Sequence, residues 1–504
     1  MKITELLPAL SIPAPIGDYT VGTLSASTEH INGETLFFLT EGVNYEKKRL
    51  LPFILAKKPL AIVASEKVTE KTDVPILYTD NVRKAYAEAY FRFCGLQQSK
   101  MKRIAITGTN GKTTTATMLY EILRAEKIKT GFIGTGKILL DGKSVSSPYY
   151  SMTTPDPEIL YPTLKEMQDN GCEAVIMEAS SHALALEKLA PLHFDAAIFT
   201  NLSAEHLDFH RDMEEYYLAK ARLFQKTEHA ILNIDDPYGQ RLAHECTCPI
   251  TRVGALFEGD VMAKSIERRF PEGSSYIYKT EGPTFSVKLK LSGMYQIYNS
   301  MLALSAAIHL GILPCHARKT MEAIKKVPGR LERIADGSVT VYLDYAHTPE
   351  ALLSSLQDVK KTLGKRQRLW VVFGCGGERD RKKRPQMAKI AESLSDKVIL
   401  TLDNCRAESP MQILHDTVQG FANIKSVRII SNREKAIRYA LLAMAEKDTL
   451  IIAGKGHENY NIDKGGYHPF DERKIVLDAL KERKGGHTVI YEDRTETTVH
   501  RTGN

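Results

Sequence analysis

Short runs of apolar residues alternate with helix-like stretches along most of this 504-residue chain. In the middle of the chain the apolar runs lie at residues 104–106, 131–134, 174–177, 196–199 and 230–234. Continuously apolar strands that alternate with helices are typical of a parallel sheet covered by helices on both faces. This region is therefore predicted to form a doubly wound α/β domain.

Two further units flank this central region. Strand-like runs at 35–39 and 60–64 and a helical pattern at 81–94 precede a polar linker at 97–100. After residue 327 the alternation of strands and helices starts again, with strands expected at 339–343, 369–373, 397–400, 427–430 and 449–452. This third unit has the alternation of a Rossmann-like fold, although it carries no complete glycine fingerprint for a dinucleotide.

The expected fold is thus α/β with three domains. We place them at residues 1–98, 99–327 and 328–484, followed by a polar tail at 485–504. Shorter alternating segments near 255–292 predict a small antiparallel addition to the central domain, and a helix is expected at 299–310.

Composition narrows the class of protein. The chain is 43% hydrophobic and 26% charged, with a net charge of +7 that suits small anionic substrates. It has no Lys/Arg-rich arm typical of nucleic-acid binding and no apolar run of membrane-spanning length. Its seven cysteines follow no framework spacing, which favours reduced thiols. We expect a cytoplasmic enzyme with neither nucleic acid nor a membrane as partner.

The segment at 103–115 carries the clearest chemical signal. An apolar strand, a turn with two glycines, a Lys-Thr pair and a helical pattern to residue 125 follow one another. Backbone N–H groups at such a helix N-terminus bind phosphate oxygens, the lysine adds a positive charge, and the threonine binds Mg²⁺. The turn is shorter than usual, and a loop without a ligand is the alternative. The expected phosphate contacts are Gly108, Thr109, Asn110, Gly111, Lys112, Thr113 and Thr114.

Polar residues follow two neighbouring strands of the predicted central sheet. Glu178 ends the strand at 174–177, and His206 and His210 lie just beyond the strand at 196–199. Open α/β sheets bind ligands at the carboxyl ends of their strands, and a carboxylate with an imidazole near phosphates can bind a divalent cation. Either histidine by itself would more simply be a structural residue.

These segments resemble the Mur ligases of peptidoglycan synthesis. The resemblance runs from Thr107 to about Asp471, and the order and spacing of the motifs agree. Besides the shortened phosphate loop, the matching segments are 153–155, 177–182, 201–210, 217–222, 299, 329–330, 344–349, 374–380, 403–406 and 454–458.

The resemblance implies ATP and Mg²⁺ as cofactors and assigns the catalytic residues. Lys112 and Thr113 would hold the phosphates and one Mg²⁺, while Glu178 and His206 would bind metal. Lys220 resembles the family's carbamylated lysine, whose neutral amine takes up CO₂ and becomes an anionic metal ligand; a solvated helix lysine is the alternative. In the nucleotide site, Asn299 would face the adenine, and Arg330 and Asp344 would reach the nucleotide.

The resemblance implies two sets of substrate contacts, one for the acyl donor and one for the amino-acid acceptor. For a UDP-muramoyl dipeptide they are Ser27, Thr153, Thr154, Ser180 and Lys188, where Lys188 replaces the family's arginine. The N-terminal Asp-Ser-Arg signature appears only as Ala-Ser-Thr at 26–28, so the acyl donor stays open.

The amino-acid acceptor end resembles the diaminopimelate-adding branch. A zwitterionic acceptor needs a cation for its carboxylate and an anion for its ammonium, which Arg406 and Glu458 offer. Cys405 replaces the family's proline beside Arg406, and a surface salt bridge is the simpler alternative. The expected diaminopimelate contacts are Arg379, Asp403, Asn404, Arg406, Gly454 and Glu458.

The resemblance therefore predicts an ATP-dependent amide ligase that joins meso-diaminopimelate to the dipeptide through an acyl phosphate, and we expect it to be a monomer. Three alternatives stay open. They are a paralogue with another acyl donor, such as a folylpolyglutamate or cyanophycin-type enzyme, a ligase with lysine as acceptor, and a non-catalytic nucleotide-binding regulator. We also expect domain closure about a hinge near 327–330.

Overall fold

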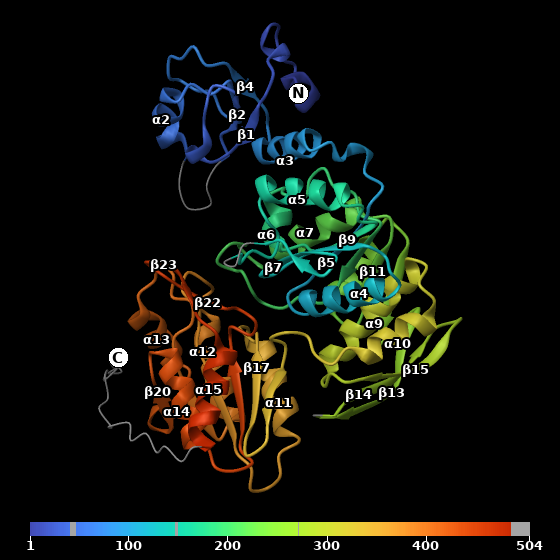
Figure 1. Ribbon diagram of the computed structural model, residues 1–504, viewed down its shortest axis with the longest axis vertical. Coiled ribbons are helices and arrows are strands. Elements are labelled where there is room, and N and C mark those ends of the chain that lie inside the picture. The colour runs from blue at the N-terminus through green and yellow to red at the C-terminus, as the bar shows by residue number, and fades with distance from the viewer. Residues whose placement is uncertain (41–46, 147–149, 271, 485–504) are drawn as a thin grey trace.

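The computed structural model describes residues 1–40, 47–146, 150–270 and 272–484, and the predicted tail lies outside these ranges. The described residues form three β-sheets, each packed against helices, and a small separate hairpin. The N-terminal sheet and the third sheet lie at opposite ends of the molecule in Figure 1, with the central sheet between them. The predicted class, a three-domain α/β chain of mostly parallel sheets, is confirmed.

The N-terminal sheet is parallel, with the order β1-β2-β3-β4. Its longest helix, α3 (Val82–Phe93), begins where the Asn81 side chain accepts a hydrogen bond from the Lys84 N–H, a typical N-cap. The other elements are α1 (Ile3–Leu6), β1 (Thr23–Ser25), β2 (Thr35–Phe38), α2 (Leu51–Ala56), β3 (Ala61–Ala64) and β4 (Ile76–Tyr78).

The central sheet has the order β15-β14-β13-β12-β11-β10-β5-β9-β6-β7-β8. The strands from β13 through β6 run parallel, whereas both edges are antiparallel. The strands are β5 (Lys102–Thr107), β6 (Thr130–Gly134), β7 (Lys137–Leu140), β8 (Lys143–Ser144), β9 (Ala174–Glu178), β10 (Ala196–Phe199), β11 (Ala230–Asn233), β12 (Ile250–Gly254), β13 (Val261–Arg269), β14 (Gly273–Lys279) and β15 (Thr284–Leu289). The antiparallel addition predicted at 255–292 is confirmed, but it continues the main sheet, and the β7–β8 edge was not predicted.

Helices cover both faces of the central sheet (Figure 1). They are α4 (Lys112–Ala125), α5 (Pro157–Asp169), α6 (Ser181–Ala185), α7 (Met213–Ala221), α8 (Pro237–Glu245), α9 (Met294–His309) and α10 (Pro314–Ala323). The helix predicted at 299–310 begins earlier, at Met294, because Gly293 adopts a φ of 109° and its carbonyl accepts the Gln296 N–H. Half-exposed residues in the first turn hid this start from the apolar pattern.

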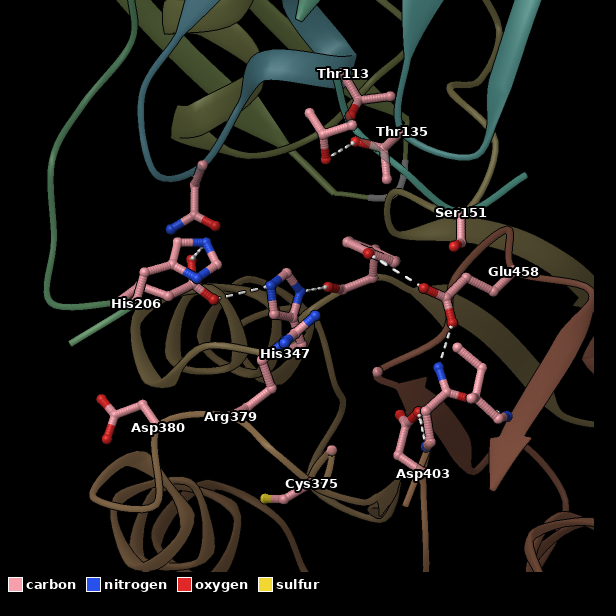
Figure 2. A pocket seen from close by; sticks show the side chains of 18 of the residues that line it. Thr113, Thr135, Ser151, His206, His347, Cys375, Arg379, Asp380, Asp403 and Glu458 are labelled. Carbon is pink, nitrogen blue, oxygen red and sulfur yellow. Dashed lines mark hydrogen bonds and ion pairs between the residues drawn. The ribbon is translucent and has the colours of Figure 1, made fainter. Parts of the chain in front are cut away.

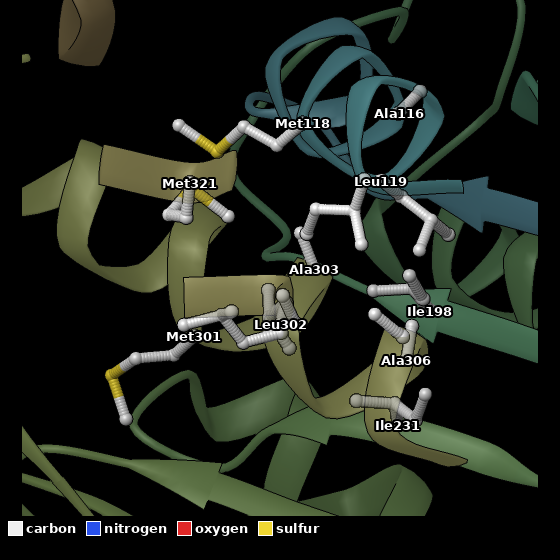
Figure 3. Close-up of a cluster of buried hydrophobic side chains, with 14 of the residues drawn as sticks. Ala116, Met118, Leu119, Ile198, Ile231, Met301, Leu302, Ala303, Ala306 and Met321 are labelled. Atoms are coloured by element: carbon white, nitrogen blue, oxygen red, sulfur yellow. The ribbon is translucent and has the colours of Figure 1, made fainter. Parts of the chain in front are cut away.

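The phosphate-loop helix α4 packs on a core of buried apolar side chains. Figure 3 shows Leu119 of α4 next to Ala303 of α9 and Met118 of α4 next to Met321 of α10, with Ile198 of β10 in the same cluster. Burial of a side chain such as Leu302 contributes about 1.5–3 kcal/mol. This packing fixes α4, and therefore the loop before it, against the sheet.

The third sheet has the order β16-β17-β21-β18-β19-β20, and only β16 runs antiparallel. Its strands are β16 (Glu332–Asp336), β17 (Thr340–Asp344), β18 (Leu369–Phe373), β19 (Lys397–Leu400), β20 (Val427–Ile429) and β21 (Thr449–Ala453). Its helices are α11 (Pro349–Lys360), α12 (Lys383–Leu394), α13 (Pro410–Val418), α14 (Arg433–Ala443) and α15 (Glu472–Lys484). A separate hairpin consists of β22 (Tyr460–Asp463) and β23 (Gly466–Pro469).

Single 3₁₀ turns occur at Ile16–Asp18, Thr28–His30, Lys47–Leu50, Leu96–Gln98, Arg222–Lys226 and Ile424–Ser426. Among the described helices, none is long and apolar enough to cross a membrane. The domain limits placed near residues 98 and 327 fall in the connections between the sheets, and as limits they stay a prediction. The carboxyl ends of the central and third sheets face a common cavity, whose lining follows both sets of strands.

Candidate active site

The phosphate loop leads from β5 into α4 in a conformation that needs its glycines. Gly108 and Gly111 adopt φ values of 142° and 89°, and a Cβ at Gly111 would lie 2.4 Å from Asn299 Oδ1. Asn201, beyond the end of β10, fixes the turn: its carbonyl accepts the Thr109 N–H at 2.8 Å, and its Oδ1 accepts the Asn110 N–H at 2.9 Å. The loop is therefore held open in front of the helix N-terminus.

Lys112 lies inside this loop. Its Nζ donates to the carbonyls of Gly108 and Thr109, at 2.9 and 2.8 Å. Burial lowers the pKa of Lys112, and Glu178 and Glu205 partly oppose that effect. The ammonium thus lies at the N-terminus of α4, where both the helix dipole and the lysine charge favour an anion.

Glu178 accepts hydrogen bonds from the first turn of α4 and from the turn after β6. Its Oε2 accepts the Thr113 hydroxyl at 3.0 Å and the Thr135 hydroxyl at 3.0 Å, while its Oε1 accepts the Thr135 N–H at 3.1 Å. The Thr135 hydroxyl also lies 3.0 Å from that of Thr153. Arg330, from the connection to the third domain, donates to the Thr113 hydroxyl at 3.1 Å. Four predicted site residues therefore lie in one contiguous group.

Lys220 on α7 is buried, which excludes the solvated-lysine alternative. Its side chain is 2% exposed, its Nζ donates to the Gly108 carbonyl at 3.0 Å and lies over the Tyr216 ring, 4.6 Å from the centroid. Burial, and then the charge of Lys112, lowers the pKa of Lys220 well below its usual value. A buried amine without a carboxylate partner in contact is easily neutral, as the reaction with CO₂ requires.

His206 lies close to this lysine but on a strained backbone. It has a φ of 58°, and its ring meets that of His182 edge to face, with 4.8 Å between centroids. Burial lowers the pKa of His206 well below its usual value, so the ring is neutral and has a lone pair to offer. Such a conformation in a non-glycine residue is typical of functional sites.

Glu205 joins the two domains, a role that sequence reasoning missed. Its Oε1 lies 3.0 Å from Nε2 of His347 and 3.6 Å from Nζ of Lys383, both in the third domain. Burial alone would raise the pKa of Glu205, but the ion pair and hydrogen bond with His347 hold it well below its usual range. Figure 2 shows His206 and His347 near one another at the meeting of the two domains. The segment at 344–349 was part of the resemblance, but nothing local indicated a partner for His347.

The acceptor residues form a polar cluster at the strand ends of the third sheet. Asn404 Nδ2 donates to Glu458 Oε2 at 2.9 Å, and Lys455 Nζ donates to Asn404 Oδ1 at 2.6 Å. Arg406, with a φ of 53°, donates from its side chain to the Gly377 carbonyl at 2.8 Å. The cations of Lys455 and Arg433 hold the pKa of Asp403 below its usual value against the effect of burial. Burial raises the pKa of Glu458.

Two cavities gather the predicted residues. The larger one, of about 290 Å³, joins the phosphate loop to the acceptor cluster (Figure 2). Of the predicted residues its lining includes Thr109, Asn110, Gly111, Lys112, Thr113, Thr153, Glu178, His206, Arg330, Arg379, Asp403, Asn404, Arg406, Gly454 and Glu458.

A second cavity, of about 90 Å³, begins at the same loop and extends toward α11. Thr114, Asn299, Arg330 and Asp344 line it, and their contacts with a nucleotide stay predictions. Both carboxylate oxygens of Asp344 already accept hydrogen bonds, from the Leu331 N–H at 3.2 Å and from the Ser355 hydroxyl. Burial raises the pKa of Asp344.

Four predicted substrate residues lie outside the linings of these two cavities. The Thr154 hydroxyl donates to the Glu178 carbonyl at 2.8 Å, and Ser180 caps α6 by accepting the Ala183 N–H. Lys188 Nζ pairs with Asp156 at 2.6 Å, and Ser27 accepts the Glu29 N–H at 3.3 Å. Their contacts with a substrate stay predictions.

The donor set fits a hard divalent cation. The Thr113 hydroxyl and the Glu178 carboxylate, 3.0 Å apart, are oxygen ligands of the kind Mg²⁺ prefers beside substrate phosphates. Within the described ranges, no three side chains of His, Cys, Asp or Glu are grouped so as to hold a metal. Besides Glu178 and His206, a bound ion would therefore depend on Thr113, on phosphate oxygens and on a carbamate at Lys220.

A phosphate loop that faces the strand ends of a second α/β domain defines a nucleotide-dependent enzyme with its cleft between domains. The Mur ligase middle domain matches residues 106–307, and the Mur ligase, glutamate ligase domain matches residues 329–456. The chain belongs to the Mur ligase family and is an ATP-dependent ligase.

Similar proteins cover nearly the whole chain. The UDP-N-acetylmuramoyl-L-alanyl-D-glutamate–2,6-diaminopimelate ligase of Geobacillus kaustophilus is 37% identical over 478 residues, 93% of this chain and 96% of that protein. The ligase of the same name from Aquifex aeolicus is 36% identical over 472 residues, 93% of this chain and 95% of its own length.

Among solved structures, one of a UDP-N-acetylmuramoyl-L-alanyl-D-glutamate–2,6-diaminopimelate ligase has a TM-score of 0.67 at 28% identity, covering 96% of this chain and 99% of that one. Mycobacterium tuberculosis folylpolyglutamate synthase complexed with ADP has a TM-score of 0.62 at 19% identity and covers 74% of this chain and 92% of its own. The latter likeness concerns the fold alone.

Proposed function

We propose that this ligase adds meso-diaminopimelate to UDP-N-acetylmuramoyl-L-Ala-D-Glu in the synthesis of peptidoglycan precursors. One observation carries the proposal: a single cavity of about 290 Å³ joins Lys112 and Thr113 to Arg379, Arg406 and Glu458. The relatives named for this reaction, which match across more than nine-tenths of the chain, support the same choice of acyl donor and acceptor.

The reaction proceeds in two steps. The γ-carboxylate of the D-Glu residue attacks the γ-phosphorus of ATP, which gives an acyl phosphate and ADP. The amine of diaminopimelate then attacks the acyl carbon, and the tetrahedral intermediate expels phosphate, loses a proton and leaves the amide. Because little covalent chemistry falls to the protein, positioning and charge stabilisation supply most of the rate.

Residues of the phosphate loop would hold ATP. The backbone N–H groups of Gly111 to Thr113 lie at the N-terminus of α4, and Lys112 balances phosphate charge. Arg330 is close enough to Thr113, at 3.1 Å, to reach the transferred phosphoryl group. Asn299 and Asp344 would hold the nucleoside in the second cavity.

Thr113, Glu178, His206 and a carbamylated Lys220 would hold Mg²⁺, which when bound neutralises negative charge on the phosphates. Carbamylation joins the neutral Nζ of Lys220 to the carbon of CO₂ and releases one proton. The product replaces a buried amine by an anion. The position of Nζ beside the phosphate loop, 3.0 Å from the Gly108 carbonyl, supports this role.

The acyl donor would lie along β9 and the loop before α5. Thr153 lines the main cavity, Thr154 and Ser180 follow it toward α6, and Lys188 and Ser27 would continue the site toward the N-terminal domain. A different acyl donor would change the donor contacts, and lysine as acceptor would change the acceptor contacts. Neither would change the phosphate site. A regulator without catalysis has no need of the buried Glu178–Thr113 pair and Lys220.

We further propose that the protein acts as a monomer in the cytoplasm on water-soluble substrates, with neither nucleic acid nor a membrane as partner. Light scattering coupled to size-exclusion chromatography tests the monomer. The proposed reaction is tested by measuring ADP release and product mass with a panel of acyl donors crossed with diaminopimelate and lysine. Lys112→Ala is the inactive control. Turnover with a folate or another acyl donor in place of the UDP-muramoyl dipeptide would refute the proposed donor.

A further inference from the structure

We propose that Arg384, which does not line the cavity, is a positioning residue that sets the spacing between the acceptor-binding arginines Arg379 and Arg406. This inference rests on the proposed function, since it concerns how the acceptor carboxylate is recognised. Arg384 lies in the first turn of α12, and its side chain is fully buried.

Arg384 forms a two-point contact with one carboxylate. Its Nη1 donates to Glu408 Oε1 at 2.8 Å, and its Nη2 donates to Glu408 Oε2 at 2.7 Å. A bidentate guanidinium–carboxylate pair fixes both distance and angle, unlike a contact made by a lysine ammonium. Glu408 follows Arg406 by two residues, so the pair anchors the segment that carries Arg406.

The same pair also holds the loop that carries Arg379. Nη2 of Arg384 donates to the Gly376 carbonyl at 3.1 Å, and Glu408 Oε2 accepts the Glu378 N–H at 2.8 Å. Arg379 is the next residue, and its guanidinium faces the main cavity. The Arg384–Glu408 ion pair thus contacts both the loop that carries Arg379 and the segment that carries Arg406.

The two loops are in close contact, so a displacement of one moves the other. The Gly377 N–H donates to the Asn404 carbonyl at 2.9 Å, and the Arg406 side chain donates to the Gly377 carbonyl at 2.8 Å. A Cβ at Gly377 would lie 1.9 Å from the Cys405 carbonyl, which leaves no free space between them.

A neighbouring arginine provides a matched control. Arg381 pairs with Asp416 at 3.0 Å and with Glu408 at 3.3 Å, carboxylates that Arg384 also contacts. Its side chain is 56% exposed, however, and the contact with the Gly376 carbonyl belongs to Arg384. A general effect of charge near Glu408 would appear in variants of both arginines, whereas a positioning effect would appear only at Arg384.

The test compares Arg384→Lys with Arg381→Lys in the full-length enzyme. Arg384→Lys keeps the charge but loses the two-point contact. Since a misplacement of about 1 Å can cost up to about 100-fold, we expect its KM for diaminopimelate to rise about tenfold or more. Its KM for ATP should stay within about twofold of the wild type, and its preference for diaminopimelate over lysine should fall. Arg381→Lys should behave as the wild type.

A second variant covers the case in which Arg384→Lys does not fold. Glu408→Gln keeps an acceptor for the Glu378 N–H but loses the charged pair, and it should show the same selective rise in KM. A lower melting temperature with unchanged KM values and unchanged preference for diaminopimelate would overturn the inference. If the wild type itself fails to use diaminopimelate, the proposed function fails instead, and the two results are distinct.

Discussion

The imidazole of His457 in the third domain donates from Nε2 to the backbone carbonyl of Thr135 in the central domain, at 3.1 Å. Thr135 in turn donates to Glu178 from both its N–H and its hydroxyl. His457 adjoins Glu458 of the acceptor cluster. A single residue, Thr135, therefore links the acceptor loop to the carboxylate proposed to bind metal.

The His457 contact predicts a pH dependence of stability. Burial and the Arg330 guanidinium lower the pKa of His457 to about 4, against 6.5 for a free imidazole. Because the unfolded chain binds this proton first, the contribution of His457 is fully present above about pH 6.5 and is lost as the pH falls toward about 4. The free energy of unfolding by urea, measured across this range, should fall with pH.

Replacing His457 should make that fall shallower. We expect His457→Gln to reduce the slope by at most about 1.4 kcal/mol per pH unit, the value for one proton. His30→Gln, which removes an exposed imidazole of the N-terminal domain, is the control and should keep the wild-type slope. An equal slope in wild type and His457→Gln would contradict the assignment.

A second prediction concerns closure of the third domain onto the central domain. Gly136 has a φ of 73°, and a Cβ there would lie 3.1 Å from His457 Nε2. Gly136→Ala should therefore weaken closure and lower kcat, whereas Gly171→Ala is a control, since its φ is 72° but no atom lies within 4 Å of its Cβ.

Small-angle scattering checks the closure directly. The wild type should become more compact when an ATP analogue and the acyl donor are added, with the hinge near 327–330, and Gly136→Ala should compact less. Equal radii of gyration with and without ligands in the wild type would count against the hinge.

Local patterns predicted much of the central site. The strand, the two-glycine turn and the start of α4 are local features, and the helix predicted from Lys112 to Ala125 has those bounds in the structure. The contact of Glu205 with His347 and Lys383 could not be predicted in this way. It depends on how two domains meet, which no local periodicity encodes.

The sequence pattern also could not predict which charged side chains are buried. The four basic residues at 381–384 have the composition of a solvated surface segment, yet Lys383 and Arg384 are buried. Their burial is compensated by Glu205, Glu408 and Asp416, carboxylates from distant parts of the chain. Lys220 is similar: the resemblance indicated its role, but its environment follows from the packing of α7 against the phosphate loop.

The third prediction is acceptor choice. Arg406 should pair with the distal carboxylate of meso-diaminopimelate, and loss of a buried charged contact of this kind costs about 2–5 kcal/mol. Arg406→Ala should raise the KM for diaminopimelate steeply and leave the KM for ATP nearly unchanged. Lysine, which has no second carboxylate, should be a poor acceptor for the wild type and lose little more in the variant. Comparable wild-type efficiency with both amino acids would refute the role of Arg406 and direct attention to Cys405.

The last prediction tests the carbamate at Lys220. Burial lowers the pKa of this amine well below its usual value, which favours the nucleophilic free base that reacts with CO₂. Lys220→Ala should lose ligation, since an anionic ligand beside the phosphate loop is removed. Added bicarbonate or a short carboxylic acid should partly restore activity by placing a carboxylate in the space left by the side chain.

The kind of additive that restores activity distinguishes a carbamylated Lys220 from an unmodified ammonium. A carboxylic acid restores negative charge, whereas a short alkylamine restores the positive charge of an unmodified lysine. Initial rates of phosphate release from Lys220→Ala, measured with each additive, should therefore rise with acetate and not with ethylamine. Rescue by the amine instead, or wild-type activity in Lys220→Ala without additive, would rule out the carbamate.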